Sequence, residues 1–183
     1  MTNTIADITR DAQVLVLVGT NPEEAHPVLG MQIRAAVERG TRLVVVDPRD
    51  IGLAKHADVH LKLRPGTNVA FANGMAHVIV RDGLFDRAFV EERTDREGFE
   101  ALCATVAPYT PERVAEICRI DACDLVAAAH LYAEADRAAI LYCLGVTEHA
   151  TGTDGVMALS NLAMMCGKIG RAGCGVNPIR GQN

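Results

Sequence analysis

One apolar run near the N-terminus constrains the fold of this chain more than any other feature. Residues 14–18 are all Val or Leu, and they end at Gly19 before a polar turn that extends to Glu24. A short apolar run bounded by turn residues is typical of a strand buried on both faces of a sheet. A helical pattern follows over residues 26–39, so the segment reads as the start of a βαβ unit. Its loop is predicted either to bind a ligand, most often phosphate, or to be a plain core turn, and the pattern supports both equally.

Strands and helices continue to alternate along the chain. Further strands are expected at residues 41–46, 59–63 and 138–143. Helices are expected over residues 26–39, 52–55, 68–81, 86–92, 96–106, 111–118, 121–135 and 153–168. This alternation predicts an α/β fold with a mostly parallel, Rossmann-like sheet, flanked by helices and joined by right-handed crossovers. We expect one domain over residues 1–183, in which residues 173–183 form an irregular tail that lines a ligand site.

The composition excludes several classes of partner. Apolar residues make up 49% of the 183 residues, whereas aromatic residues make up only 4% and Trp is absent. Since stacking surfaces are scarce and the formal net charge is −5, neither nucleic acid nor an anionic membrane is an expected partner. No apolar run has the length of a membrane span or a signal sequence.

The six Cys residues are expected to be reduced and mostly buried. None belongs to a Cys-x-x-Cys pair, and most lie in apolar patterns, where Cys behaves as a small hydrophobe. Zinc and iron–sulfur sites need clustered thiolates, so no metal ligand is predicted in this sequence. Reduced thiols indicate a cytoplasmic location. His77 and His130 lie at helical spacing among apolar neighbours, which favours packed or half-exposed side chains over metal ligands.

Four polar loops are expected to meet at one edge of the sheet. They follow Val18, Val46, Leu63 and Cys143. The carboxyl ends of parallel strands lie at the same edge, and open α/β sheets bind their ligands there. The first loop lacks a GxGxxG pattern, so ordinary NAD or FAD recognition is not supported.

Two of these loops contain residues for which the sequence suggests particular roles. Asp47 follows the second strand, where an acidic residue commonly reads a ribose or base edge, but it is equally consistent with a cap for the next turn. In the third loop, Pro65 and Gly66 predict a tight bend, and Thr67 or Asn68 is expected to cap the following helix.

Several longer motifs occur in a fixed order along the chain. They are VGTNPEEAHPV, VVDPR, LRPGTNVA, GVTEHATGTDGV and GKIGRAGCGVNPIRGQN. Together they resemble the molybdopterin oxidoreductase family, and specifically the catalytic (alpha) subunit of formate dehydrogenases. The resemblance implies one α/β domain, excised from a longer subunit, that binds bis-molybdopterin guanine dinucleotide with molybdenum or tungsten. The complete subunit would oxidise formate to carbon dioxide and pass electrons to the metal.

The resemblance also places individual residues at the cofactor. The loops after the first two strands would hold the pyrophosphate and nucleotide, and the loop after Cys143 would contact the pterin. The implied residues are Gly19, Thr20, Asn21, Glu24, His26, Asp47, Arg49, Pro65, Gly66, Asn68, Gly145, Val146, Thr147 and Glu148. Related sequences often have Asp at the position of Asn68, so the role of this side chain is open.

Three further residues are implied at the substrate. Arg180 matches the Arg that faces the metal and orients formate in formate dehydrogenases, and a planar guanidinium suits a carboxylate. Gln182 would assist, and His149 lies in a loop that could approach the site. Without the resemblance, Arg180 would be read as an anchor for its loop.

Two features of the family are absent from this sequence. No Cys is followed by His, as the metal-ligating Cys or selenocysteine would be, and there is no iron–sulfur motif. We therefore expect an iron–sulfur cluster only in other parts of the subunit, and no formate oxidation by this chain alone. Its expected partners are the remaining domains, electron-transfer subunits and formate. The alternatives are a free-standing nucleotide-binding module or a domain of another molybdenum enzyme, such as a nitrate reductase.

Overall fold

The computed structural model describes residues 3–179, and a five-stranded parallel sheet forms its centre. The strands are β1 (Val14–Val18), β2 (Arg42–Val46), β3 (Val59–Leu61), β4 (Ala138–Tyr142) and β5 (Gly175–Pro178). Their order is β3-β2-β1-β4-β5, and every neighbouring pair is parallel. The sheet grows from β1 to β3 on one side and continues with β4 on the other, so the order reverses between β1 and β4. The expected parallel α/β sheet is confirmed.

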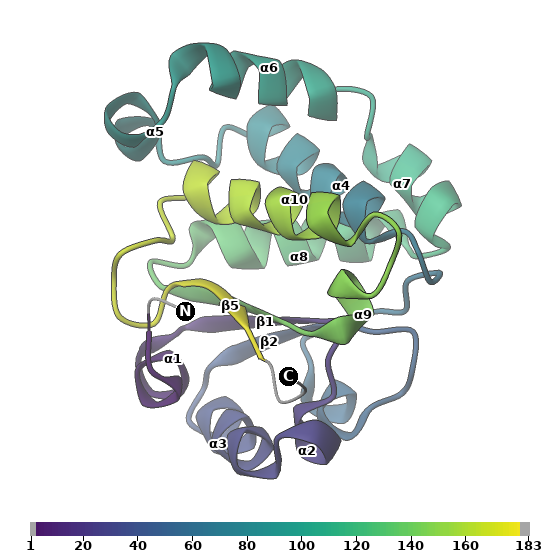
Figure 1. Ribbon diagram of the computed structural model, residues 1–183, viewed down its shortest axis with the longest axis vertical. Helices are drawn as coiled ribbons and strands as arrows, with labels where there is room; N and C mark the ends of the chain where they lie inside the picture. The colour runs from purple at the N-terminus through teal and green to yellow at the C-terminus, as the bar shows by residue number, and fades with distance from the viewer. Residues whose placement is uncertain (1–2, 180–183) are drawn as a thin grey trace.

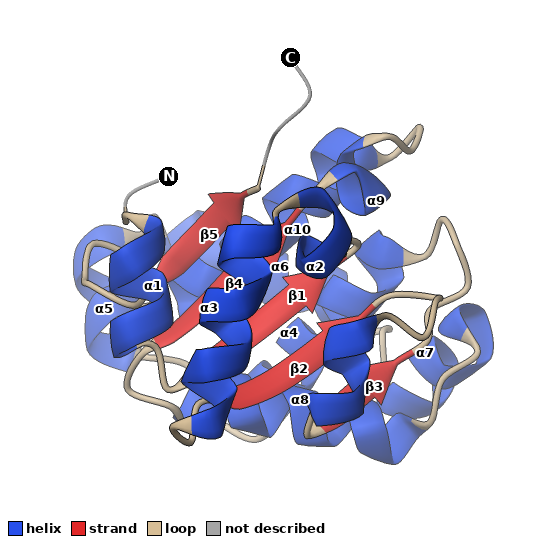
Figure 2. Cartoon of the chain, turned by 90° about the horizontal axis from the view of Figure 1, so that it is seen from below, coloured by secondary structure: helices blue, strands red, loops and turns tan. Residues whose placement is uncertain are grey.

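Helices cover both faces of this sheet. They are α1 (Ile5–Asp11), α2 (Pro22–Ala25), α3 (Pro27–Glu38), η1 (Gly52–His56), α4 (Asn68–Arg81), α5 (Arg87–Arg93), α6 (Arg96–Val106), α7 (Pro111–Cys118), α8 (Ala122–Glu134), α9 (Leu144–Thr147) and α10 (Gly152–Met165). Helices α1 and α3 lie on one face, and α4, α8 and α10 lie on the other (Figure 1). Figure 2 shows the first face, with α3 crossing in front of the strands. Within residues 3–179, no helix has the length and apolar character needed to cross a membrane.

Alternate residues of each central strand divide the core into two halves. In β1, Val14, Val16 and Val18 join the cluster formed with α4, α8 and α10. Leu15 and Leu17 join the cluster formed with α1 and α3. All five side chains are buried, because a strand covered on both faces has no polar side. This explains the uninterrupted apolar run from which the fold was predicted.

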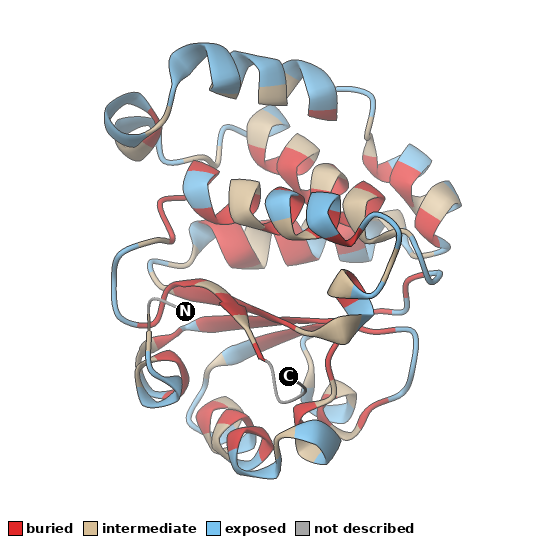
Figure 3. Ribbon diagram, in the orientation of Figure 1, coloured by how far each residue is buried: buried red, intermediate tan, exposed pale blue. Residues whose placement is uncertain are grey.

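Helices α5 and α6 form an outer layer beyond α4 and α10 (Figure 1). Most of their surface is exposed in Figure 3, and the fully buried residues are Val90 in α5 and Val106 in α6. The rings of Phe85 and Phe99 pack with their centroids 5.2 Å apart, which ties α6 to the segment before α5. This layer covers other helices and does not reach the carboxyl edge of the sheet.

Two short elements depart from the sequence expectation. The polar loop expected after β4 begins with helix α9, and the tail expected to be irregular contains β5. Strand β5 includes Gly175 and Pro178, which are poor strand formers in isolation. It forms because β4 offers an open edge, against which Gly175 pairs with Ala139 and Pro178 with Tyr142. Tertiary pairing therefore overrides local preference here.

The Cys residues are less buried than expected, whereas the two His have structural contacts. All six Cys are free thiols: Cys118, Cys166 and Cys174 are buried, Cys103 and Cys143 are partly buried, and Cys123, in the first turn of α8, is exposed. Burial raises the pKa of Cys166 to about 12, which keeps that thiol protonated. His77 Nδ1 lies 3.2 Å from the Val106 carbonyl oxygen, and His130 lies between two carboxylates. Among residues 3–179, no three His, Cys, Asp or Glu side chains are grouped to hold a metal ion.

Candidate functional site

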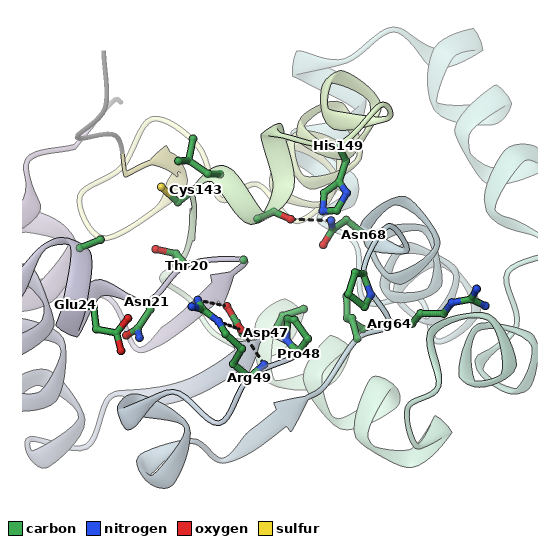
Figure 4. Close-up of a pocket in the computed structure, with 17 residues that line it drawn as sticks. Thr20, Asn21, Glu24, Asp47, Pro48, Arg49, Arg64, Asn68, Cys143 and His149 are labelled. Carbon is green, nitrogen blue, oxygen red and sulfur yellow. Dashed lines mark hydrogen bonds and ion pairs between the residues drawn. The ribbon is translucent and has the colours of Figure 1, made fainter.

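A cavity of about 370 Å³ lies at the carboxyl edge of the sheet, over the ends of β1 and β4. This is where the strand order reverses, which is the usual ligand position in open α/β sheets. All four loops expected at this edge contribute to it, and Figure 4 shows their side chains converging. The lining residues are Gly19, Thr20, Asn21, Glu24, Ala25, Val46, Asp47, Pro48, Arg49, Leu63, Arg64, Pro65, Asn68, Cys143, Leu144, Gly145 and His149.

Ten of the residues that the sequence suggested lie at this cavity. They are Gly19, Thr20, Asn21, Glu24, Asp47, Arg49, Pro65, Asn68, Gly145 and His149. Residues His26, Gly66, Val146, Thr147 and Glu148 do not line it. Val146 is buried because α9 turns its side chain into the core, so only its main chain is left near the loop. Arg180 and Gln182 lie outside the described residues.

Two glycines make a close contact between the first and fourth loops. Gly19 has a φ of +56°, and a Cβ atom added there would lie 2.6 Å from the carbonyl carbon of Gly145. A Cβ atom added to Gly145 would lie 2.6 Å from Gly19 Cα. The Gly145 N–H donates to the Gly19 carbonyl over 3.1 Å, and the Gly19 N–H donates to the Val46 carbonyl over 2.8 Å. Glycine at both positions therefore lets three loops share one wall of the cavity.

Asn68 joins the third loop to the fourth. Its Nδ2 donates to the Gly145 carbonyl over 3.0 Å, as Figure 4 shows. A carboxylate cannot donate this bond, which gives a physical reason for Asn at a position where related sequences often have Asp. Thr67 occupies the N-cap position of α4, as one of the two expectations had it, but it makes no capping bond, because its Oγ1 donates to the Arg64 carbonyl over 2.7 Å.

The helices that start at the cavity lack side-chain caps. Within the described residues, α4 and α9 contribute their first residues, Asn68 and Leu144, to the cavity, and α2 contributes Glu24 and Ala25; none of the three has a side-chain hydrogen bond at its N-cap. Helices α3, α10 and η1 are uncapped as well. In contrast, α1, α5, α6, α7 and α8 lie away from the cavity lining, and each has a side-chain cap. The cavity therefore faces the uncapped N-terminus of α4, whose first N–H groups carry a partial positive charge, which suits an anionic ligand.

Two polar atoms at the end of β1 lack partners. Thr20 Oγ1 and Asn21 Oδ1 are both inaccessible to solvent and have no hydrogen-bond partner within residues 3–179. Thr20 as a whole is only 4% exposed. An unpaired buried polar group costs about 1–3 kcal/mol, so such groups call for a ligand. Both residues line the cavity, and a polar ligand with phosphate or hydroxyl groups fits them.

Asp47 and Arg49 form a charged pair at the second loop. Asp47 is 3% exposed, and its Oδ1 accepts hydrogen bonds from the Arg49 N–H at 2.9 Å and from Arg49 Nε at 3.1 Å. The hydrogen bond and charge of Asp47, with a smaller contribution from Glu24, raise the pKa of the Arg49 guanidinium. Asp47 therefore shapes its own turn and also presents Arg49 to the cavity, which leaves both interpretations of this residue open.

Several lining residues were not singled out from the sequence. Among them, Cys143 Sγ donates to the Ile179 carbonyl over 2.7 Å, which fixes the main chain after β5 beside the cavity. Its position directly after a buried strand and two residues before Gly145 was the available signal. Arg64 lines the cavity through its stem, while its guanidinium points away in Figure 4.

Comparisons with known proteins agree with this geometry. The family model described as molybdopterin oxidoreductase matches residues 1–181. The F420-dependent formate dehydrogenase subunit alpha of Methanocaldococcus jannaschii is 45% identical over all 183 residues, which make up 27% of that protein. Formate dehydrogenase H of Escherichia coli is 43% identical over the same span and 25% of its length. The chain therefore spans about a quarter of the length of these relatives.

A solved structure has the same fold. Acetylene hydratase from Pelobacter acetylenicus is 34% identical, with a TM-score of 0.70 over 86% of this chain and 21% of its own. The switch-point cavity, the two-glycine contact and the match over nearly the full sequence lead to one conclusion: this chain belongs to the molybdopterin oxidoreductase family.

Proposed function

We propose that this chain is a domain of a formate dehydrogenase catalytic subunit and that its cavity holds part of bis-molybdopterin guanine dinucleotide. The observation that carries the proposal is the pair of unpartnered polar atoms, Thr20 Oγ1 and Asn21 Oδ1, in a cavity facing the uncapped N-terminus of α4. The two relatives that are formate dehydrogenase subunits, at 45% and 43% identity, support the reaction. Acetylene hydratase has the same fold, but its name indicates a different reaction, so the fold alone does not identify the reaction.

The dinucleotide would lie across the switch point in a Rossmann-like manner. Its pyrophosphate would approach Gly19, where the wall carries no side chain, and the N-terminal N–H groups of α4. The nucleotide end would lie against Asp47 and Arg49, with Glu24 close by. The pterin would contact the main chain of residues 145–148.

The chain's own residues would bind and orient rather than transfer electrons. When bound, the molybdenum or tungsten of the cofactor supplies the two-electron oxidation of formate. His149 lies at the cavity beside Asn68 in Figure 4 and would hydrogen-bond at its entrance. Arg180, assisted by Gln182, would hold the formate carboxylate in its planar fork. Formate, the other domains and electron-transfer subunits would be the partners, and an iron–sulfur cluster would lie in another part of the subunit.

The ligand class can be tested on the 183-residue chain with GDP, which shares the guanosine and pyrophosphate of the cofactor. We expect calorimetry to detect GDP binding, and Arg49→Ala to weaken it about tenfold, since a charged hydrogen bond contributes about 1.5–3 kcal/mol. Arg113→Ala, far from the cavity in α7, is the matched control and should bind like the parent chain. Equal affinity of all three proteins would refute the assignment of this cavity.

The reaction is tested in the complete subunit. Arg180→Lys keeps the charge but loses the planar fork, so kcat/KM for formate should fall at least about a hundredfold. If the variant keeps nearly full formate turnover, the chain belongs to a family member with another substrate, such as a nitrate reductase.

A further inference from the structure

Glu23 occupies a space that two glycines leave open. It is the second residue of α2, and its Cα packs on α3, where a Cβ atom added to Gly30 would lie 2.9 Å away. Its carboxylate lies over the start of η1, where a Cβ atom added to Gly52 would be 1.9 Å from Oε2. Oε1 forms an ion pair with Arg34 Nη2 of α3 at 3.0 Å. Glu23 therefore touches two segments besides its own helix, α3 and η1.

The backbone conformation does not require glycine at either position. Gly30 lies inside α3, and neither it nor Gly52 is among the described residues with positive φ. Alanine would fit both backbones and would be favoured in a helix, since Gly costs about 0.5–1 kcal/mol relative to Ala there. The contact with Glu23 is therefore the physical reason for glycine at both positions.

The segments joined by Glu23 line the part of the cavity that is proposed to bind the nucleotide. Helix α2 has only four residues, so it is too short to be stable without tertiary contacts. Its N-cap residue Asn21 and its third residue Glu24 line the cavity. Gly52 begins η1 and ends the loop that contains Asp47 and Arg49. A side chain wedged between α2 and η1 thus sets the spacing between the first and second loops.

We infer that Glu23 is a positioning residue that fixes the first loop against the second, and so sets the width of the site for the guanosine diphosphate part of the ligand. This inference rests on the proposed function for the ligand. The Glu23 side chain is 27% exposed and Arg34 is 47% exposed, so their ion pair contributes little by charge alone. The shape of the Glu23 carboxylate group therefore matters more than its charge, and Gln, which has nearly the same shape, should keep the positioning role.

A double-mutant cycle tests the contact without any ligand. Gly52→Ala should lower the melting temperature by at least about 4 °C, because its Cβ meets the carboxylate. Combining it with Glu23→Ala should restore at least half of that loss, since the shorter side chain removes the clash. Additive effects of the two substitutions would overturn the contact. Glu38→Ala, at the exposed end of α3, is the control and should give no rescue.

The positioning role is tested by two further measurements. Glu23→Ala should weaken GDP binding about tenfold with little change in melting temperature, whereas Glu23→Gln should restore affinity to within about twofold. In nuclear magnetic resonance spectra, Glu23→Ala should shift the amide signals of Asn21 and Arg49 together. Shifts confined to α2 and α3, or unchanged GDP affinity of Glu23→Ala, would overturn the inference. If the parent chain binds no GDP, the proposed ligand fails, and the amide shifts still decide the role of Glu23.

Discussion

At the scale of single residues, the site depends on the absence of side chains as much as on their presence. Gly19 and Gly145 bring two main chains together at a distance that no Cβ atom allows. Asn68 then donates to the Gly145 carbonyl from a third segment. The wall of the cavity is therefore built of main chain, which can approach a phosphate closely.

Substitution of Gly145 tests this wall. Gly145 is not among the positive-φ glycines of the described residues, so Gly145→Ala introduces only the clash with Gly19. Because the neighbouring atoms are backbone and cannot turn aside, we expect a loss of about 1–3 kcal/mol in the free energy of unfolding by urea. Gly98→Ala, in exposed helix α6, should leave stability unchanged or raise it. A neutral Gly145→Ala would show that the loops do not touch in solution.

At the scale of helices and strands, the chain treats helix starts in two ways. Among the described residues, five helices away from the cavity (α1, α5, α6, α7 and α8) begin with Thr or Asp caps, such as Thr110 in α7 and Asp121 in α8, whereas α4, which starts at the cavity, has no side-chain cap. Helices α3, α10 and η1 are uncapped as well. The capped starts serve stability, since each cap satisfies a free N–H group. The uncapped start of α4 keeps its N–H groups for a ligand.

Removing a cap should therefore separate stability from binding. Asp121 accepts from the Cys123 N–H over 2.7 Å, so Asp121→Ala should cost about 1 kcal/mol in the free energy of unfolding. The same variant should bind GDP like the parent chain, because α8 contributes no residue to the cavity. A parallel loss of GDP affinity in calorimetry would contradict the division between the two kinds of helix start.

The junction of α4 and α8 carries a pH-dependent contact. His130 Nδ1 lies 2.8 Å from Glu134 Oε1, and its Nε2 lies 2.9 Å from Asp82 Oδ2 at the end of α4. The hydrogen bond to Glu134, followed by that to Asp82, raises the pKa of His130 above 6.5. A raised pKa in the folded state gives stability that is complete below the unfolded pKa and lost as pH rises through the folded value.

We therefore expect the contribution of His130 to shrink between pH 6 and pH 9. Thermal melts of the parent chain and His130→Gln should differ more at pH 6 than at pH 9. A gap between parent and His130→Gln that is constant across this pH range would contradict the assignment.

At the scale of the whole molecule, the core that stabilises the fold is separate from the edge that forms the cavity. The sheet is buried between two helical layers, and α5 and α6 add a third layer on one side (Figure 1). The carboxyl edge is left for the cavity, on which loops after four strands converge. Such an arrangement can hold a large ligand at one end without changing the core.

The chain alone should bind ligand but not oxidise formate. Its sequence has no Cys followed by His and no clustered thiols, so it supplies no metal ligand of the kind seen in the family. We expect no dye reduction above background when the purified chain is mixed with formate. Turnover that depends on the chain and disappears on heating would refute this prediction.

The sequence by itself determined four of the five strands, the parallel sheet and the four loop positions, because apolar runs and turn residues act locally. It also identified Gly19, Asp47, Asn68 and Gly145 as candidates through their motifs. Only the tertiary structure decided which of them touch: Asn68 and Gly145 are 77 positions apart, and strand β5 exists only against β4. The contact of Glu23 with Gly30 and Gly52 is of the same kind. Contacts between distant segments depend on how the layers pack, and that packing is a property of the whole core rather than of any local run of residues.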